Sequence, residues 1–142
     1  MNPEDFITLA GRLVAAAEAS VPEARHRAAA SRAYYGAFYA VSSLLSEWGF
    51  AVRRNAYGHQ DAYSQLWQSG HRLAQEVAGL LDDLRTQRIR ADYRLEDQRF
   101  RTPDSAKSCV EQAAELLIRL SRCRADADEI KAAIEKSQAR DT

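Results

Sequence analysis

Three short segments of the chain combine residue types that can hold a phosphate group with residue types that can move a proton. They are residues 31–39 (Ser-Arg-Ala-Tyr-Tyr-Gly-Ala-Phe-Tyr), residues 54–59 (Arg-Asn-Ala-Tyr-Gly-His) and residues 88–93 (Arg-Ile-Arg-Ala-Asp-Tyr). A guanidinium can bind two phosphate oxygens through parallel hydrogen bonds, and imidazole and phenol groups can transfer protons. The segments therefore indicate chemistry on a phosphate-bearing ligand.

Two of these segments also have a purely structural explanation. Arg88 and Asp92 are four residues apart, so they can form a surface ion pair on one helix, worth roughly a few tenths of a kcal/mol. Residues 54–59 can be a solvated turn that leads into a polar helix cap. Both explanations stay open at the level of the sequence.

The segment at residues 31–39 alternates small and aromatic side chains within a helical pattern. Its small residues, Ala33, Gly36 and Ala37, would let another helix approach closely while the rings fill the gaps. Arg32 fits this explanation less well, because it lies on a largely apolar helix and a buried arginine must be paired.

Arginine is concentrated in one stretch, although the whole chain is neutral. The chain has 20 basic and 20 acidic residues, and 17 of the basic ones are arginine. Between residues 84 and 101 six arginines occur with three acids, namely Arg85, Arg88, Arg90, Arg94, Arg99 and Arg101 with Asp92, Glu96 and Asp97. A GC-rich genome and phosphate recognition would each explain this preference for arginine. The zero net charge argues against a protein that coats nucleic acid constitutively.

The sequence contains no pattern typical of a metal or cofactor site. His26, His59 and His71 lie in different predicted elements, and neither cysteine has a nearby ligand partner. The spacing of structural zinc sites, the glycine-rich phosphate loop and the serine nucleophile elbow are all missing. We therefore expect no metal and no cofactor.

Cys109 and Cys123 fall in one predicted helix, fourteen residues apart. That length of helix spans about 21 Å, far beyond the reach of a disulfide bond. Free thiols fit a reducing compartment. Because no apolar run approaches the length of a membrane span and no secretion signal is visible, we expect a soluble, cytoplasmic protein with no membrane partner.

Helical periodicity and end signals divide the chain into helices. The first begins at Asn2-Pro3, the second runs from about Pro22 to Trp48, a short third from about His59 to Gln68, a fourth from about His71 toward Ala91, and a fifth from Thr102-Pro103. Ser20 and Glu23 have the spacing of a capping box at the start of the second helix. Ile130, Ala133 and Ile134 either extend the fifth helix or form a loose C-terminal one.

The same periodicity predicts which side chains face the core. In the short third helix these are Tyr63, Leu66 and Trp67, and in the fifth helix they include Leu117. Residues 93–102 are predicted to form a polar loop. The prediction is an all-α, up-and-down bundle of four main helices plus a short helix and a C-terminal helical extension. We expect one domain over residues 1–142, with a core at about 4–124 and a helical or loose tail at 125–142.

The aromatic segment and the arginine segment together carry a resemblance. The run Ser-Arg-Ala-Tyr-Tyr-Gly-Ala-Phe in a long second helix, a histidine that starts a short helix, and Arg-x-x-Ala-Asp-Tyr near the end of the next helix resemble the HEPN superfamily (higher eukaryotes and prokaryotes nucleotide-binding), in its small bacterial stand-alone branch. The resemblance covers about residues 4–122. It implies a helical bundle that dimerises, often a metal-independent endoribonuclease of toxin–antitoxin, CRISPR-linked or phage-defence systems.

The resemblance also implies roles for particular residues. The family signature is an arginine followed after four to six residues by a histidine, with the arginine on the scissile phosphate and the histidine as acid or base while the 2′-OH attacks. Here Tyr93 stands five residues after Arg88, whereas Arg54 and His59 match the signature but precede the short helix. The implied catalytic candidates are Arg88, Asp92, Tyr93, Arg54 and His59, and the implied substrate contacts are Arg32, Arg85, Arg90 and Tyr35.

The sequence thus supports a HEPN-type protein that binds or cleaves RNA in a toxin–antitoxin, phage-defence or CRISPR-linked setting. The alternative is a catalytically silent helical dimer that serves as a protein-interaction or nucleotide-binding module. The expected partners are a second copy of the chain, an RNA substrate, and a nucleotidyltransferase-type antitoxin or another defence-system protein.

Overall fold

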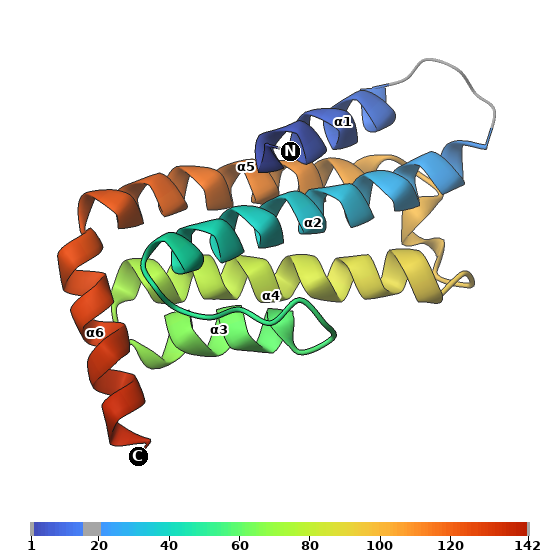
Figure 1. Cartoon of the computed structure of the whole chain (residues 1–142). Coiled ribbons are helices and arrows are strands. Elements are labelled where there is room, and N and C mark those ends of the chain that lie inside the picture. Colours follow the sequence, from blue (N-terminus) through green and yellow to red (C-terminus); the bar gives the residue numbers. More distant parts are fainter. Residues whose placement is uncertain (1, 16–20, 142) are drawn as a thin grey trace.

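The computed structural model describes residues 2–15 and 21–141, and these residues form helices joined by short connections (Figure 1). The helices are α1 (Pro3–Ala15), α2 (Pro22–Glu47), α3 (Gly58–Gln68), α4 (Arg72–Tyr93), α5 (Asp104–Ala125) and α6 (Ala127–Arg140), with a 3₁₀ turn, η1, at Gln98–Phe100. No strand occurs among the described residues. The all-α bundle predicted from periodicity is confirmed.

Four helices make the bundle, and two others lie at its side and end. Helices α1, α2, α4 and α5 run alternately up and down, α3 lies along α4, and α6 crosses the end of the bundle and contacts α3 (Figure 1). Helix α6 is a separate helix that buries Ile130 and Ile134 completely. Within the described ranges, no helix combines the length and the apolar character that a membrane span requires.

Helix α1 packs closely on α2 because glycine stands at the crossing point. A methyl group on Gly36 would lie 2.8 Å from Cγ1 of Ile7 and 3.0 Å from the carbonyl oxygen of Pro3. Ala33 and Ala37, on the same helix, are fully buried. The close-packing explanation of residues 31–39 therefore holds for its small residues.

The arginine buried in α2 is Arg27, whereas Arg32 is exposed. Arg27 donates hydrogen bonds of 2.8–3.1 Å to the carbonyl oxygens of Arg90, Ala91, Arg94, Leu95 and Asp97 and to the carboxylate of Glu23. The concern that Arg32 must be paired was therefore misplaced. Helical spacing turns position 27 toward the open end of α4, whose last carbonyls have no partner within their own helix.

The predicted polar loop at residues 93–102 contains a core residue. Phe100 is completely buried, its ring lies 5.2 Å from the guanidinium carbon of Arg27, and its carbonyl oxygen accepts a 2.8 Å hydrogen bond from Nδ1 of His26. The predicted loop was therefore wrong at this position. A single aromatic residue without periodic neighbours gives no sequence signal of burial.

Two side chains predicted to face the core lie farther out. Trp67 is 46% exposed, because α3 buries His59, Ala62 and Leu66, which leaves Trp67 one position away from the buried side. In α5 the fully buried residue is Leu116, and Leu117 is partly buried.

The capping box predicted at the start of α2 can be checked only at Glu23. Ser20, the first residue of the expected capping box, lies outside the described residues. Glu23, its expected partner, accepts a 3.1 Å hydrogen bond from Arg27. Gly49, which follows the last residues of α2, adopts a φ of 90°, which glycine allows without strain.

Candidate functional site

Arg88 lies among three tyrosine rings on the α4 side of the α2–α4 contact. Its guanidinium carbon is 5.3 Å from the ring centre of Tyr35, 5.4 Å from that of Tyr34 and 5.8 Å from that of Tyr93. The Arg88 side chain is only 16% exposed. Cation–π attraction at these distances holds the guanidinium plane in place without neutralising its charge.

The polar partners of Arg88 are few. One terminal nitrogen lies 3.5 Å from Oδ2 of Asp92, at the outer limit of a hydrogen bond, and the same oxygen accepts from the Ser31 hydroxyl at 3.2 Å. The Nε atom of Arg88 is buried and has no hydrogen-bond partner among the described residues. The ion pair proposed as a structural explanation is therefore present, but it leaves most of the Arg88 donors unused.

A chain of hydrogen bonds continues behind Arg88, from α2 through α3 to α4. The Tyr34 hydroxyl lies 2.9 Å from Nδ1 of His59, and Nε2 of His59 lies 3.2 Å from Oδ1 of Asp82. Because a carboxylate only accepts hydrogen bonds, this network assigns the proton of the neutral ring to Nε2. Nδ1 is then the acceptor for the Tyr34 hydroxyl.

The environment favours the neutral forms of both His59 and Tyr34. Burial lowers the pKa of His59 from 6.5, with a contribution from the nearby charges of Arg85 and Arg88, and the Asp82 hydrogen bond opposes this only partly. Burial also raises the pKa of Tyr34 to about 12, although Arg88 acts in the opposite direction. At neutral pH, Arg88 therefore faces an un-ionised phenol.

The structure links His59 to Arg88 rather than to Arg54. His59 and Arg88 share Tyr34 as a neighbour, whereas no hydrogen bond, ion pair or ring contact in the described part of the chain joins Arg54 to His59. Arg53, the residue before Arg54, binds Asp61 of α3 through two nitrogens at 2.7 and 2.8 Å. Sequence spacing alone did not reveal the His59–Tyr34–Arg88 link.

The expected substrate contacts lie on two of the bundle helices. Arg85 is exposed and Arg90 half-buried on α4, while Tyr35 is half-buried and Arg32 exposed on α2. Tyr93, in the last turn of α4, is 71% exposed. Three residues that shape the site received no functional role from the sequence, namely Tyr34, Asp82 and Arg27. They could not have been found from spacing, because each acts through a contact between different helices.

One histidine has acidic neighbours close enough to resemble a metal site. Ligand atoms of His71, Asp126 and Glu129 lie within 4.8 Å of one another. However, Nδ1 of His71 accepts the Leu73 amide proton at 3.2 Å, so its ring proton sits on Nε2, 3.6 Å from Glu129. Nε2 thus faces the Glu129 carboxylate at a distance too long for a hydrogen bond, and because it carries the ring proton it offers no lone pair to a cation.

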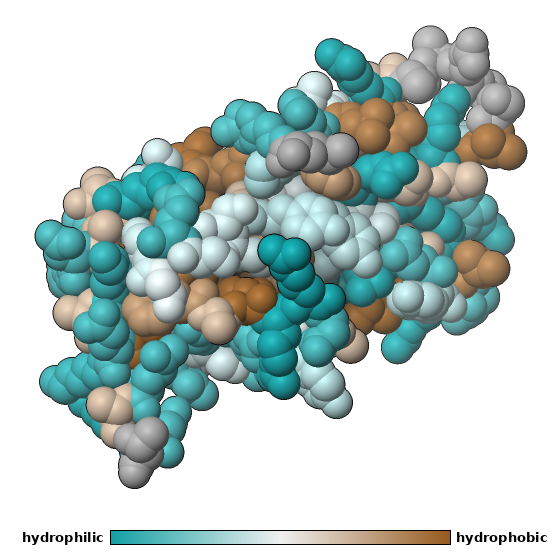
Figure 2. Space-filling model, in the orientation of Figure 1, coloured by the Kyte–Doolittle hydropathy of each residue, from teal (hydrophilic) through white to brown (hydrophobic). Residues whose placement is uncertain are grey.

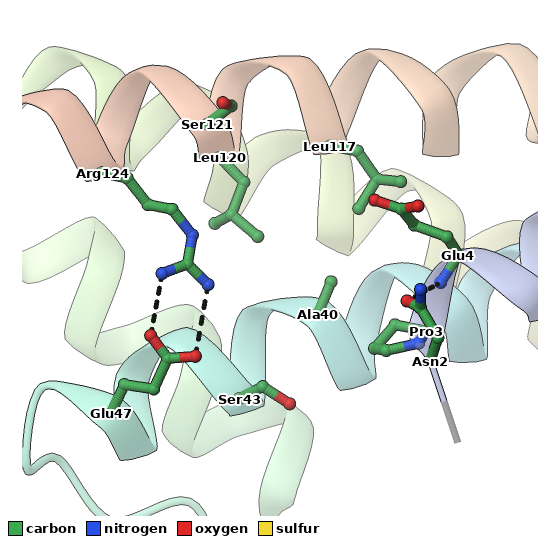
Figure 3. Close-up of a pocket in the computed structure, with 10 residues that line it drawn as sticks. All are labelled: Asn2, Pro3, Glu4, Ala40, Ser43, Glu47, Leu117, Leu120, Ser121 and Arg124. Carbon is green, nitrogen blue, oxygen red and sulfur yellow. Dashed lines mark hydrogen bonds and ion pairs between the residues drawn. The ribbon is translucent and has the colours of Figure 1, made fainter.

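A separate groove lies where the start of α1 meets α2 and α5 (Figure 3). It has a volume of about 310 Å³, and one of its walls is the ion pair of Glu47 with Arg124 at 2.8 Å. The carboxylates of Glu4 and Glu47 line it. It contains none of the expected site residues, and its acids would repel a phosphate.

Comparison with known proteins agrees with this architecture. A family model described as the HEPN domain matches residues 3–123 of the 142-residue chain. The searches of curated proteins and of solved structures gave no match. The matched region contains α1 to α4, most of α5 and every expected site residue. The chain therefore belongs to the HEPN domain family, whose members include nucleotide-binding and ribonuclease-like proteins.

Proposed function

We propose that this HEPN protein binds RNA at Arg88 and cleaves it without a metal ion. The observation that carries the proposal is the setting of Arg88, which is held by three tyrosine rings and has, within the described ranges, one carboxylate partner at 3.5 Å. Such a guanidinium is positioned by the protein and still has donors for a phosphate. HEPN domains commonly bind RNA and form dimers, which supports the proposal.

In the proposed reaction the chain supplies a phosphate contact and a proton donor. Arg88 holds the phosphodiester while the 2′-oxygen of the same nucleotide attacks phosphorus, which breaks the bond to the 5′-oxygen and leaves a 2′,3′-cyclic phosphate. Tyr93 donates a proton to the leaving 5′-oxygen, since a phenol gives a proton at neutral pH more readily than it takes one. Asp92 orients Arg88, and solvent accepts the 2′-OH proton.

Other residues have supporting roles in this proposal. Arg32, Arg85, Arg90 and Tyr35 contact the RNA on either side of the scissile phosphate. Arg54 with His59 is the second catalytic candidate, and it ranks below Arg88 because both His59 nitrogens already have partners inside the protein. As an acid or base, His59 would first have to leave Tyr34 and Asp82.

The proposed biological setting is a cytoplasmic toxin–antitoxin or phage-defence system, CRISPR-linked systems included. The proposed active form is a homodimer that places two sites beside one cleft. A nucleotidyltransferase-type antitoxin, or another protein of the defence system, is the proposed partner.

Arg88 substitution tests the proposal directly. With EDTA present, wild-type protein should cut a labelled single-stranded RNA and leave cyclic phosphate ends. Arg88→Ala should reduce cleavage at least tenfold, and Arg88→Lys should restore little, because an ammonium cannot bind two phosphate oxygens in the same fork. Arg122→Ala, which removes an exposed arginine of α5, is the matched control. If wild-type protein neither cuts nor binds RNA, the proposal fails.

A catalytically silent dimer is the second candidate. The observation that favours it is the engagement of His59 on both nitrogens, which leaves the site without a free imidazole. RNA binding that depends on Arg88, with no cleavage by wild-type protein, would select this candidate. Loss of cleavage in Tyr93→Phe with binding retained would select the enzyme instead.

A further inference from the structure

A second groove begins beside the Arg88 site and runs along the outward side of α2. It has a volume of about 710 Å³ and is lined by Tyr35, Phe38, Tyr39, Ser42, Ser43 and Ser46 of α2 and by residues 52–55 of the connection to α3. In Figure 2 the middle of the molecule between α1 and α3 is pale, as surfaces rich in tyrosine and serine are. This face is thus neither strongly apolar nor uniformly charged.

The charge of this groove has one sign. Its charged lining residues are Arg53 and Arg54, and no carboxylate of the described residues lines it, whereas the groove of Figure 3 contains Glu4 and Glu47. Arg53 is already bound to Asp61. Arg54 is exposed and has no ion pair or hydrogen bond within residues 2–15 and 21–141. Its charge is therefore available to an anionic ligand.

The α2 wall of the groove is aromatic and partly open. Tyr39 is 41% exposed, and its ring is inclined by 27° to that of Tyr35 at 6.0 Å between centres. Phe38 contributes a third ring, 5.8 Å from Tyr39. Open aromatic rings beside a basic side chain are the arrangement on which single-stranded nucleic acids stack their bases, because every base presents a π-face.

Tyr35 connects this groove to the proposed catalytic site. Its ring lines the groove and also lies 5.3 Å from the guanidinium carbon of Arg88. We propose that the groove binds an unpaired stretch of RNA adjoining the phosphate held by Arg88, with a base stacked on Tyr39 and a phosphate bound by Arg54. The proposal rests on the proposed function and adds a second contact site that selects single-stranded over duplex RNA, whose bases are stacked inside the helix.

A second copy of the chain is the rival occupant, and the lining favours RNA. Protein–protein interfaces are enriched in arginine and aromatic residues, so these do not distinguish the two occupants, but they are depleted in serine. Three serines line this groove, and Val52 is the one aliphatic residue of its lining in the described part of the chain.

The test measures binding of a fluorescent single-stranded RNA and of the same sequence as a duplex, by anisotropy over a series of salt concentrations. Arg54→Ala should lower the slope of log affinity against log salt by about one, as expected for one lost phosphate contact. Tyr39→Leu keeps apolar volume but loses the ring face, and should weaken single-strand binding roughly tenfold. Tyr39→Phe should retain binding, and Arg122→Ala should change affinity less than twofold.

The outcomes separate this inference from the proposed function. If Arg88→Ala weakens binding while Arg54→Ala and Tyr39→Leu do not, the groove proposal is overturned and the proposed function stands. Equal affinity of the wild type for single-stranded and duplex RNA would also overturn it. If the groove variants instead convert a dimer into a monomer with RNA affinity unchanged, the groove is an interface between copies. If the wild type binds no RNA, both proposals fail.

Discussion

His59 is the residue whose setting most changes the interpretation of the site. Its ring joins α3 to Tyr34 of α2 and to Asp82 of α4, and it is only 8% exposed. In this position it supports the tyrosine against which Arg88 packs. Its direct participation in catalysis would require the ring to turn outward.

The lowered pKa of His59 predicts that the protein loses stability on acidification. The folded state holds the pKa below 6.5, chiefly through burial, while the unfolded chain titrates near the ordinary value. Between those two values the unfolded state binds more protons, so the free energy of unfolding falls as the pH falls. The melting temperature of wild-type protein should therefore drop between pH 7.5 and pH 5.5.

The matched variant for this prediction is His59→Gln, which cannot titrate in that range. It should be less stable at pH 7.5, since it disturbs the Tyr34 and Asp82 hydrogen bonds, but its melting temperature should vary less with pH. The rest of the chain is the same in both proteins, so the comparison isolates the contribution of His59. Parallel pH profiles for wild type and variant would contradict the assignment.

At the scale of helices, Arg27 closes the C-terminal end of α4. Its two terminal nitrogens bind five backbone carbonyls within residues 90–97, which fixes the turn that carries Tyr93. Arg27→Met should lower the free energy of unfolding by about 3 kcal/mol, because it leaves the buried carbonyls at the end of α4 without their side-chain donor. Arg32→Ala, at an exposed position of the same helix, should cost less than about 0.5 kcal/mol.

Chemical denaturation would measure both effects, and hydrogen exchange would localise them. The amides of residues 94–97 should lose protection in Arg27→Met before those of the bundle core do. If Arg27→Met and Arg32→Ala lowered the free energy of unfolding equally, the contacts of Arg27 would add little stability.

The contact of α1 with α2 depends on the missing side chain of Gly36. A Cβ atom there would approach Ile7 and the Pro3 carbonyl to 2.8 and 3.0 Å. Gly36→Ala should therefore destabilise the protein by about 1–3 kcal/mol despite the better helix propensity of alanine. Gly79, in α4, has no atom within 4 Å of a Cβ, so Gly79→Ala should stabilise by about 0.5–1 kcal/mol.

Thermal unfolding of the two alanine variants gives opposite signs if this reasoning holds. Destabilisation by both would mean that glycine at Gly79 is required for another reason. Stabilisation by both would mean that α1 moves away from α2 at little cost.

At the scale of the whole molecule, the sequence predicted what depends on periodicity and missed what depends on contacts between helices. The helices and their order follow from apolar spacing, and the close packing at Gly36 follows from small residues in an aromatic segment. The burial of Arg27 and Phe100 does not follow, because it depends on how α2 meets the end of α4. His59 was expected beside Arg54, its neighbour in sequence, and lies instead against Tyr34, which is 25 residues away.

Trp67 and Tyr63 form a flat aromatic surface on α3, with rings 5.9 Å apart and inclined by only 7°, and Trp67 remains 46% exposed. Such a ring pair gains stability when a partner excludes water from it. We expect a homodimer that buries this surface. Light scattering at micromolar concentration should give twice the chain mass for wild-type protein and the single mass for Trp67→Glu.

The matched control is Tyr57→Glu, which changes a tyrosine that is 60% exposed just before α3 and should leave the dimer intact. A charge at Trp67 would have to be buried unpaired in the dimer, whereas in the monomer it stays in water, so the substitution acts on association more than on folding. Circular dichroism of Trp67→Glu should therefore match that of the wild type. If the wild type were a monomer under these conditions, or if Trp67→Glu remained a dimer, the assignment of α3 as the dimer surface would be wrong.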